Sequence, residues 1–241
     1  MPIDIGGYIA NQQITAGLTQ QGIVTRGLAF NLNPTTLNGY PASGTTLYDT
    51  QNNIQPYMVN GPTVSSQGIV LDGTNDYVRI PFNNIFNVTS GDFSVMAWQK
   101  TIQSGILFTG IITSDSTGDT NWKIHKDNGK NCFSARTGNT ESSITDFPNY
   151  TLNQFHCYAF TKSGSTAVTY LDGALGNTNN SSANPSSFSN DLALGSYRLG
   201  DATSSTWMAN MVIGQILFYN RALTAQEVAQ NFNATRSTYG V

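Results

Sequence analysis

The stretch DFSVMAWQK, at residues 92–100, decides the expected fold because its residues separate into two alternating sets. Successive side chains of a β-strand point to opposite faces of the sheet. The two faces then carry different side chains: Phe93, Val95, Ala97 and Gln99 on one, and Ser94, Met96, Trp98 and Lys100 on the other. The alternation predicts a strand, and we expect Trp98, inside it, to belong to the core.

Strand-like runs of the same kind occupy most of the chain from residue 27 onward. They lie at residues 27–32, 68–82 (two short runs around a turn), 105–113, 122–136, 155–176, 192–201 and 208–220. Asn128-Gly129 and Asp172-Gly173 are two-residue hairpin signals, because both residues of each pair tolerate positive φ. Residues 40–49 and 177–190 are expected to be loops, and no helix is expected before residue 222. Short runs at this spacing indicate a β-sandwich or barrel.

The composition excludes several classes of protein. Of the 241 residues, 39% are hydrophobic, which is enough for a core, and 10% are charged, against about 25% in average globular chains. The formal charge is −3, and the Lys and Arg residues form no basic patch. Electrostatic binding of nucleic acid or of an anionic membrane therefore finds no support, and no apolar stretch is long enough to span a bilayer.

The two ends of the chain differ from its middle. Residues 1–26 are polar and Gln-rich and are expected to form an arm or an edge strand, and residues 27–241 to form the sandwich domain. The first residues, MPIDIGGYIANQQ, lack the basic and apolar regions of a secretory signal, which predicts synthesis in a cytoplasm.

A short C-terminal helix is expected after the last strand. Thr224 and Glu227 have the spacing of a capping box, in which each side chain bonds the backbone N–H of the other. Ala225, Val228, Ala229 and Phe232 would form one apolar face of this helix. The charged cluster in YNRALTAQEV, residues 219–228, is therefore interpreted as a helix start rather than as a site.

Several stretches in order resemble one family: GIVTRGLAFNLNP, GYPASGTTLYD, VNGPTVSSQGIVLDGTNDYVRIP, GDFSVMAWQK, YLDGALG and MVIGQILFYNRALTAQEVAQNFNATR. Together they resemble the laminin-G-like, concanavalin-A-like jelly-roll domain in the form common in tailed-phage structural proteins, notably of marine and cyanobacterial phages. The resemblance covers roughly residues 23–236. It departs at residues 32–36, LNPTT in place of the usual LDAGN, and at Leu47 in place of the usual Trp.

The resemblance implies an all-β, antiparallel two-sheet jelly-roll sandwich with one short C-terminal helix. It also implies a virion surface component: a head decoration protein, a head fibre or a tail-associated adhesin. The partners would be other virion proteins and copies of the chain itself, with the arm of residues 1–26 as particle anchor. The alternative is an adhesin whose main task is binding host-surface glycans.

A second alternative, a glycan-degrading enzyme, is disfavoured by the scarcity of carboxylates. A retaining glycosidase needs two carboxyl groups about 5–5.5 Å apart, and the chain has two glutamates in all, Glu141 and Glu227. Glu227 is taken by the expected helix cap. We therefore expect no catalytic residue.

The cysteine and histidine residues suggest no catalytic site. Cys132 and Cys157 are expected to be buried free thiols. His156 and Cys157 are neighbours on one strand, so that their side chains point to opposite faces. A dyad or zinc site built from these residues and His125 is disfavoured for this reason.

The binding candidates lie in loops. No cofactor is required by the sequence, and calcium is the one ion that it suggests. Asp115, Asp119 and Asn121 offer the oxygen ligands that calcium prefers. The similar group Asp72, Asn75 and Asp76 is better explained as turn residues.

For glycan binding, the candidates are Trp122, Tyr197 and Trp207, because sugar sites combine an exposed aromatic ring with polar groups.

Overall fold

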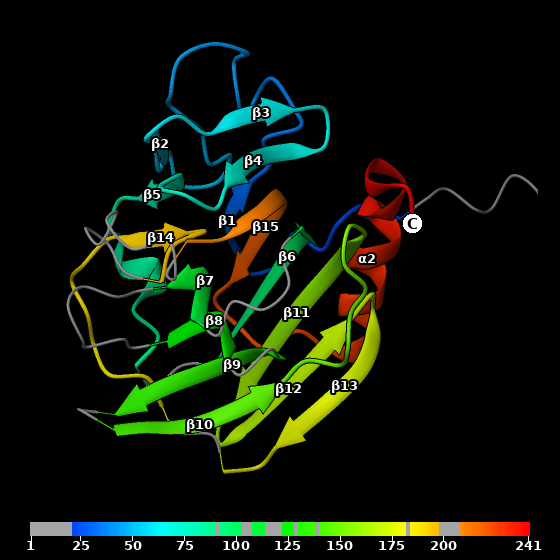
Figure 1. The fold of residues 1–241 in the computed structure, drawn as a ribbon. Coiled ribbons are helices and arrows are strands. Elements are labelled where there is room, and N and C mark those ends of the chain that lie inside the picture. Colours follow the sequence, from blue (N-terminus) through cyan, green and yellow to red (C-terminus); the bar gives the residue numbers. More distant parts are fainter. Residues whose placement is uncertain are drawn as a thin grey trace, which may run out of the picture.

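Two antiparallel β-sheets pack face to face in the computed structural model, and one helix covers the outer face of the first sheet (Figure 1). The structure describes residues 21–89, 92–102, 108–113, 122–127, 130–137, 140–181, 184–197 and 208–241. The predicted all-β sandwich with a C-terminal helix is confirmed.

The first sheet, sheet A, has eight strands in the order β13-β12-β11-β6-β15-β4-β3, with β1 also paired to β15. Its strands are β1 (Leu28–Leu32), β3 (Thr63–Ser65), β4 (Gly68–Asp72), β6 (Phe93–Thr101), β11 (Phe155–Ser163), β12 (Thr166–Leu171), β13 (Ala174–Asn179) and β15 (Asn210–Tyr219).

The second sheet, sheet B, has seven strands in the order β10-β9-β8-β7-β14-β5-β2. Its strands are β2 (Tyr57–Val59), β5 (Tyr77–Ile80), β7 (Phe108–Thr113), β8 (Trp122–Asp127), β9 (Lys130–Thr137), β10 (Thr140–Asp146) and β14 (Leu192–Leu194). A 3₁₀ turn, η1 (Asn84–Phe86), and helix α2 (Ala225–Tyr239) complete the elements. No helix among the described residues has both the length and the apolar character needed to cross a membrane.

Strand β6 lies at the centre of sheet A and has apolar side chains on both faces. Phe93 is fully buried and faces sheet B, where its ring centroid lies 5.9 Å from that of Trp122 on β8 and 6.0 Å from that of Phe133 on β9. Met96 and Trp98 point the other way, toward α2. The alternation expected from residues 92–100 is confirmed, and both faces of β6 are buried.

One of the two predicted hairpin turns is confirmed, and the other, Asn128-Gly129, lies outside the described residues. Residues Asp172 and Gly173, which connect β12 to β13, have φ values of 52° and 77°, the two positive values that a type I′ turn requires. Asp127 pairs with Lys130 across the β8–β9 hairpin.

One expectation about the strands needs correction, and the structure adds two features that the sequence did not show. Strand β13 extends to Asn179, into the segment 177–190 that was expected to be a loop, because Asn179 pairs with Ala167 of β12. The two runs within 68–82 became β4 of sheet A and β5 of sheet B, so that the chain crosses between the sheets at this turn. Strands β2, β3 and β10 were not predicted.

Helix α2 begins at the predicted capping box. Thr224 Oγ1 accepts from the Glu227 N–H at 3.2 Å, and the Thr224 N–H donates to Glu227 Oε2 at 2.9 Å. Arg221 forms a two-pronged ion pair with the same carboxylate, at 2.8 and 2.6 Å. The charged cluster therefore stabilises the start of the helix, as the sequence indicated. The ion pair of Arg221 with Glu227 was not predicted.

The buried face of α2 differs from the expected one. Ala225 is exposed, whereas Val228, Asn231 and Tyr239 are buried. The polar Asn231 lies at the centre of the interface and is 0% exposed. The helix is turned so that this amide, rather than the alanine, meets the sheet.

Asn231 connects the helix to two distant segments. Its Oδ1 accepts from the Val24 N–H at 2.7 Å, and its Nδ2 donates to Tyr219 Oη at 3.0 Å. The Tyr219 hydroxyl in turn donates to the Val24 carbonyl at 2.9 Å. Residue 24, from the segment 1–26 expected to be an arm, is therefore part of the packed sandwich, while residues 1–20 lie outside the described residues.

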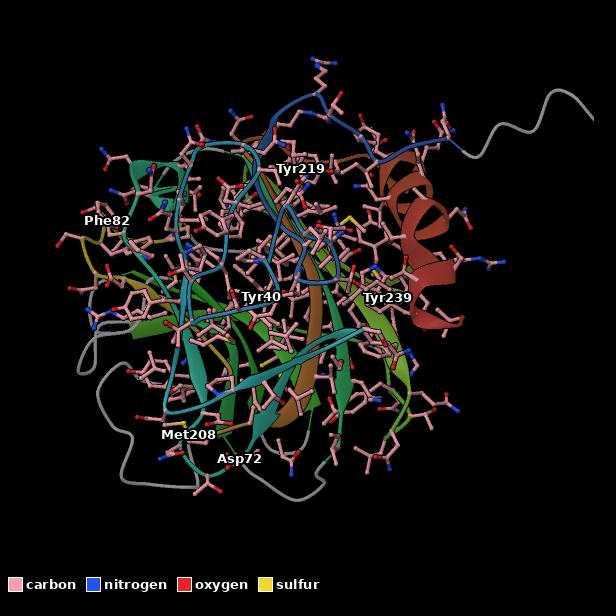
Figure 2. The ribbon with its side chains drawn as sticks, turned by 90° about the horizontal axis from the view of Figure 1, so that it is seen from above. Tyr40, Asp72, Phe82, Met208, Tyr219 and Tyr239 are labelled. Atoms are coloured by element: carbon pink, nitrogen blue, oxygen red, sulfur yellow. The ribbon has the colours of Figure 1, made fainter. Side chains whose placement is uncertain are left out.

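Tyr239, at the end of α2, lies against a glycine of β15 (Figure 2). Its hydroxyl accepts from the Gln215 N–H at 2.7 Å, at the place where the pairing of β15 with β6 shifts register. A Cβ added at Gly214 would lie 2.5 to 2.7 Å from three atoms of the Tyr239 side chain. Gly214 therefore permits the close approach of Tyr239, whose hydroxyl accepts a hydrogen bond from the backbone at this irregular point of the strand pairing.

We expect Gly214→Ala to lower the free energy of unfolding by about 1–3 kcal/mol, because the Tyr239 side chain must move and its hydrogen bond weakens. Urea unfolding monitored by tryptophan fluorescence measures this change. Gly22→Ala is the matched control, because nothing lies within 4 Å of a Cβ at that position. An equal effect of the two substitutions would contradict the role given to Gly214.

Glu227 should make stability depend on pH. The Arg221 guanidinium and the Thr224 N–H lower the pKa of Glu227 from 4.5 to about 2. A carboxylate whose pKa is lower in the folded chain adds stability above its unfolded pKa, and this stability is lost as the pH falls through the folded value.

We expect Glu227→Gln to lower the free energy of unfolding by about 1 kcal/mol at neutral pH. The difference from the wild type should shrink as the pH falls from 4.5 to about 2. Urea unfolding across this range measures it. Thr224→Ala, which keeps the ion pair with Arg221, should retain most of the pH dependence. A wild-type–Gln difference that does not change with pH would contradict this account.

Candidate functional site

The described candidate residues gather on and beside three neighbouring strands of sheet B. Trp122 begins β8, Tyr197 follows β14, and β7 lies between these two strands. Asp115, Asp119, Asn121 and Trp207 lie outside the described residues. The outer face of β8 and β9, which points away from sheet A, is therefore the part of this region whose geometry is known.

Trp122 requires a correction. Its side chain points inward, is 1% exposed, and belongs to the core between the sheets. The indole Nε1 donates to the Phe86 carbonyl at 3.1 Å. A ring enclosed in this way offers no face on which a sugar can stack, so the structure does not support the predicted contact with a glycan. The preceding acidic loop suggested an exposed ring, but the alternation of β8 places Trp122 in the core.

Tyr197 is half-buried and lies on the outer face, where it reaches across β7 to β8. Its hydroxyl is 2.5 Å from Lys123 Nζ, and the same ammonium group lies 4.5 Å from the centre of the ring. The His125 ring is 5.8 Å away, centre to centre. Tyr197 is thus held by the ammonium group of Lys123 and the imidazole of His125, both from β8.

His125 contacts two side chains of β9 on the same face. Its Nε2 lies 3.3 Å from Cys132 Sγ and 3.0 Å from Ser134 Oγ. His125 and Cys132 are directly paired across the β8–β9 hairpin. Because Asp127 pairs with Lys130, the register of the hairpin places His125 opposite Cys132. The expected hairpin therefore contained the signal for this contact.

A histidine beside a thiol and a hydroxyl has the spacing of a base and its nucleophile. Here His125, Cys132, Ser134 and Lys123 are each 1% exposed. In this conformation the cluster is closed to substrates, and its contacts stabilise the outer face of sheet B. Within the described ranges, no three His, Cys, Asp or Glu side chains lie close enough together to hold a metal ion.

The second cysteine and histidine lie in a separate environment. Cys157 is buried beneath α2, and burial raises the pKa of its thiol. His156, on the opposite face as expected, accepts from the Thr151 N–H through Nε2 at 3.1 Å. Its Nδ1 therefore carries the proton and donates to Asp172 at 2.7 Å. Both cysteines are free thiols, as predicted.

The acidic residues after β4 make the hydrogen bonds of a turn. Asp72 Oδ1 accepts from the Thr74 N–H at 2.7 Å, which is the bond of an Asx-turn. Asp76 is buried, and this burial, together with the nearby Asp72, raises the pKa of its carboxyl group. The interpretation of this group as turn residues fits these contacts.

We expect both thiols to resist a soluble disulfide reagent in the native state, because Cys132 and Cys157 are each 1% exposed. Absorbance of the released thiolate should show almost no reaction in buffer and two equivalents in guanidinium. Ser66→Cys, at an exposed turn, should add one rapidly reacting equivalent and validates the assay. Rapid native labelling that Cys132→Ala abolishes would show that the outer face of β9 is open.

Comparison with known structures shows where this fold recurs. A Trypanosoma rangeli sialidase in complex with 2,3-difluorosialic acid superposes with a TM-score of 0.65 at 14% identity, over 91% of this chain and 34% of that one. The binding domain of botulinum neurotoxin serotype D gives 0.65 at 16% identity, over 86% and 51%. The receptor-binding domain of the botulinum neurotoxin C/D mosaic serotype gives 0.65 at 15%, over 86% and 51%.

These likenesses concern the fold alone, and the chain spans between about a third and a half of the matched chains. No protein of curated function matches the sequence. The family model described as the concanavalin A-like lectin/glucanases superfamily, Laminin_G_3, matches residues 72–229. This match covers more than half of the chain and agrees with the two-sheet architecture. The chain therefore belongs to the concanavalin A-like lectin/glucanase superfamily.

Proposed function

We propose that this protein is a non-enzymatic structural component of a phage particle that displays a lectin-like, glycan-binding sandwich on the particle surface. The observation that carries the proposal is the path of residues 22–26. They run along α2, on the outer side of sheet A, and thus on the far side of the sandwich from the outer face of sheet B (Figure 1).

Two contacts besides the Asn231 network hold this segment. Gln230 Nε2 donates to the Gly22 carbonyl at 2.8 Å, and Arg221 Nε donates to the Arg26 carbonyl at 2.9 Å. The chain therefore enters the sandwich at a rigid, defined position. An anchor in residues 1–20 would attach the helix side to the particle and leave the rest of the sandwich exposed.

The described outer side chains of β8 and β9 include no carboxylate pair, which supports a role without turnover. At the described outer positions of β8 and β9 the groups are an ammonium, an imidazole, a thiol and a hydroxyl, from Lys123, His125, Cys132 and Ser134. A retaining glycosidase requires two carboxylates about 5–5.5 Å apart. Glu227, one of the two glutamates of the chain, is bound to Arg221 in the helix cap.

The structural neighbours support a glycan as the ligand. The botulinum neurotoxin domains are binding domains by description, and the sialidase was determined with a sialic acid derivative. A sandwich of this fold therefore forms about half of a receptor-binding domain and about a third of a sialidase that was determined with a sialic acid derivative. By analogy, we assign the displayed domain to recognition of glycans on the host surface.

The anchor is tested by deleting residues 1–20, which leaves Gly22 and Val24 in place. We expect the truncated chain to unfold at the same temperature as the full chain, because every contact between described residues is retained. It should be missing from purified particles assembled in host cells that produce it, as measured by mass spectrometry. Truncated protein present at the copy number of the full chain would contradict the proposal.

A further inference from the structure

A hollow that the sequence did not predict lies at the opposite end of the sandwich from β10 and β13. It has a volume of about 330 Å³ and lies between the loop of residues 34–42 and the edge strand β3. Such a volume is at the lower end of the roughly 300–1,000 Å³ found for small-molecule sites. We propose that this hollow binds a neutral saccharide, an inference that rests on the glycan-binding part of the proposed function.

The walls of the hollow combine apolar surfaces with hydroxyl groups. Leu37 is 77% exposed, and the half-buried Tyr40 packs against the core (labelled in Figure 2). Thr35, Thr36 and Ser65 supply the hydroxyl groups. A pyranose has an apolar face and a rim of hydroxyl groups, and this lining can meet both.

The hydrogen bonds already made by the hydroxyl groups define what a ligand has to offer. Thr35 Oγ1 donates to Asn33 Oδ1 at 2.7 Å, Thr36 Oγ1 to the Asn33 carbonyl at 3.0 Å, and Ser65 Oγ to the Gly68 carbonyl at 3.0 Å. Thr36 Oγ1 and Ser65 Oγ each also accept one backbone N–H, from Gly39 at 3.3 Å and from Gln67 at 3.2 Å. Each hydroxyl has one proton and two lone pairs, so that its remaining capacity is as an acceptor. The ligand must therefore donate hydrogen bonds, as sugar hydroxyl groups do.

The charge of the lining separates neutral from acidic sugars. Every residue that lines the hollow is uncharged: Pro34, Thr35, Thr36, Leu37, Tyr40, Ala42, Val64 and Ser65. A sialic acid or uronic acid would have to place its carboxylate against hydroxyl lone pairs without a cation to compensate it, which is unfavourable. The hollow is therefore complementary to hexoses and N-acetylhexosamines rather than to acidic sugars.

The loop that forms one wall is held in its shape before any ligand binds. The Thr36 carbonyl accepts from the N–H groups of Gly39 and Tyr40 at 3.0 and 2.9 Å, and the Gly39 carbonyl accepts from the Tyr48 N–H at 2.9 Å. Since little conformational entropy remains to be lost, a weakly contacting ligand such as a sugar can still bind measurably.

A glycan array that carries neutral, sialylated and uronic-acid glycans, probed with the full chain, tests the inference. We expect binding to neutral glycans. Leu37→Glu, which places a carboxylate at the hollow, should weaken it by about tenfold or more. The matched control is Leu175→Glu on β13, where the leucine is 66% exposed, and it should bind as the wild type does. Thermal unfolding of both variants checks that they remain folded.

The outcomes separate this inference from the proposed function. Neutral-glycan binding that Leu37→Glu leaves unchanged overturns the site but keeps the glycan-binding function. Binding to acidic glycans alone does the same. A wild-type chain that binds no glycan on the array overturns the glycan-binding function, and the site with it. Loss of neutral-glycan binding in Leu37→Glu but not in Leu175→Glu supports both.

Discussion

Sheet A must be covered on both faces, and the rest of the structure depends on this constraint. Strands β6 and β15 bury nearly every residue, with one set of side chains toward sheet B and the other toward α2. Burial of a large apolar side chain contributes about 1.5–3 kcal/mol. A two-sheet sandwich alone would leave Met96, Trp98 and Leu217 in water, so the helix belongs to the core architecture.

A polar residue determines how helix α2 is positioned on sheet A. Apolar contacts between α2 and the sheet have little directional preference, but the fully buried amide of Asn231 bonds both the Val24 backbone and the Tyr219 hydroxyl. A buried polar group whose bonds are satisfied favours one arrangement, because any other leaves it unpaired. The same network therefore fixes the position of α2 and the position at which the chain enters the sandwich. The proposed attachment to a particle depends on this entry point.

The outer face of sheet B and the hollow at residues 34–42 have different properties. The described groups around His125 are buried and bonded to one another, whereas the hollow is open and lined by uncharged side chains. A rigid sandwich commonly carries its binding residues on the connecting loops. This division suits a display protein, in which the sheets provide stability and a loop provides recognition.

Much of the secondary structure could be predicted because it depends on near neighbours. The alternation at residues 92–100, the turn at Asp172-Gly173 and the capping box of Thr224 and Glu227 each involve contacts within a few residues. The His125–Cys132 contact could have been predicted only by extending the expected hairpin register from its turn to the third residue pair. The acidic loop before Trp122 was misleading, because it suggested an exposed ring on a residue that the strand turns inward.

By itself, the sequence determined the strands of a β-sandwich or barrel and a capped C-terminal helix, because periodicity and turn chemistry are local properties of the chain, and the family resemblance favoured the sandwich. Only the tertiary structure decided that Asn231 replaces Ala225 on the buried face of the helix, that β4 and β5 enter different sheets, and that residues 34–42 enclose a hollow beside β3. Each of these features joins segments far apart in the chain, and their contacts exist only when the whole sandwich has closed.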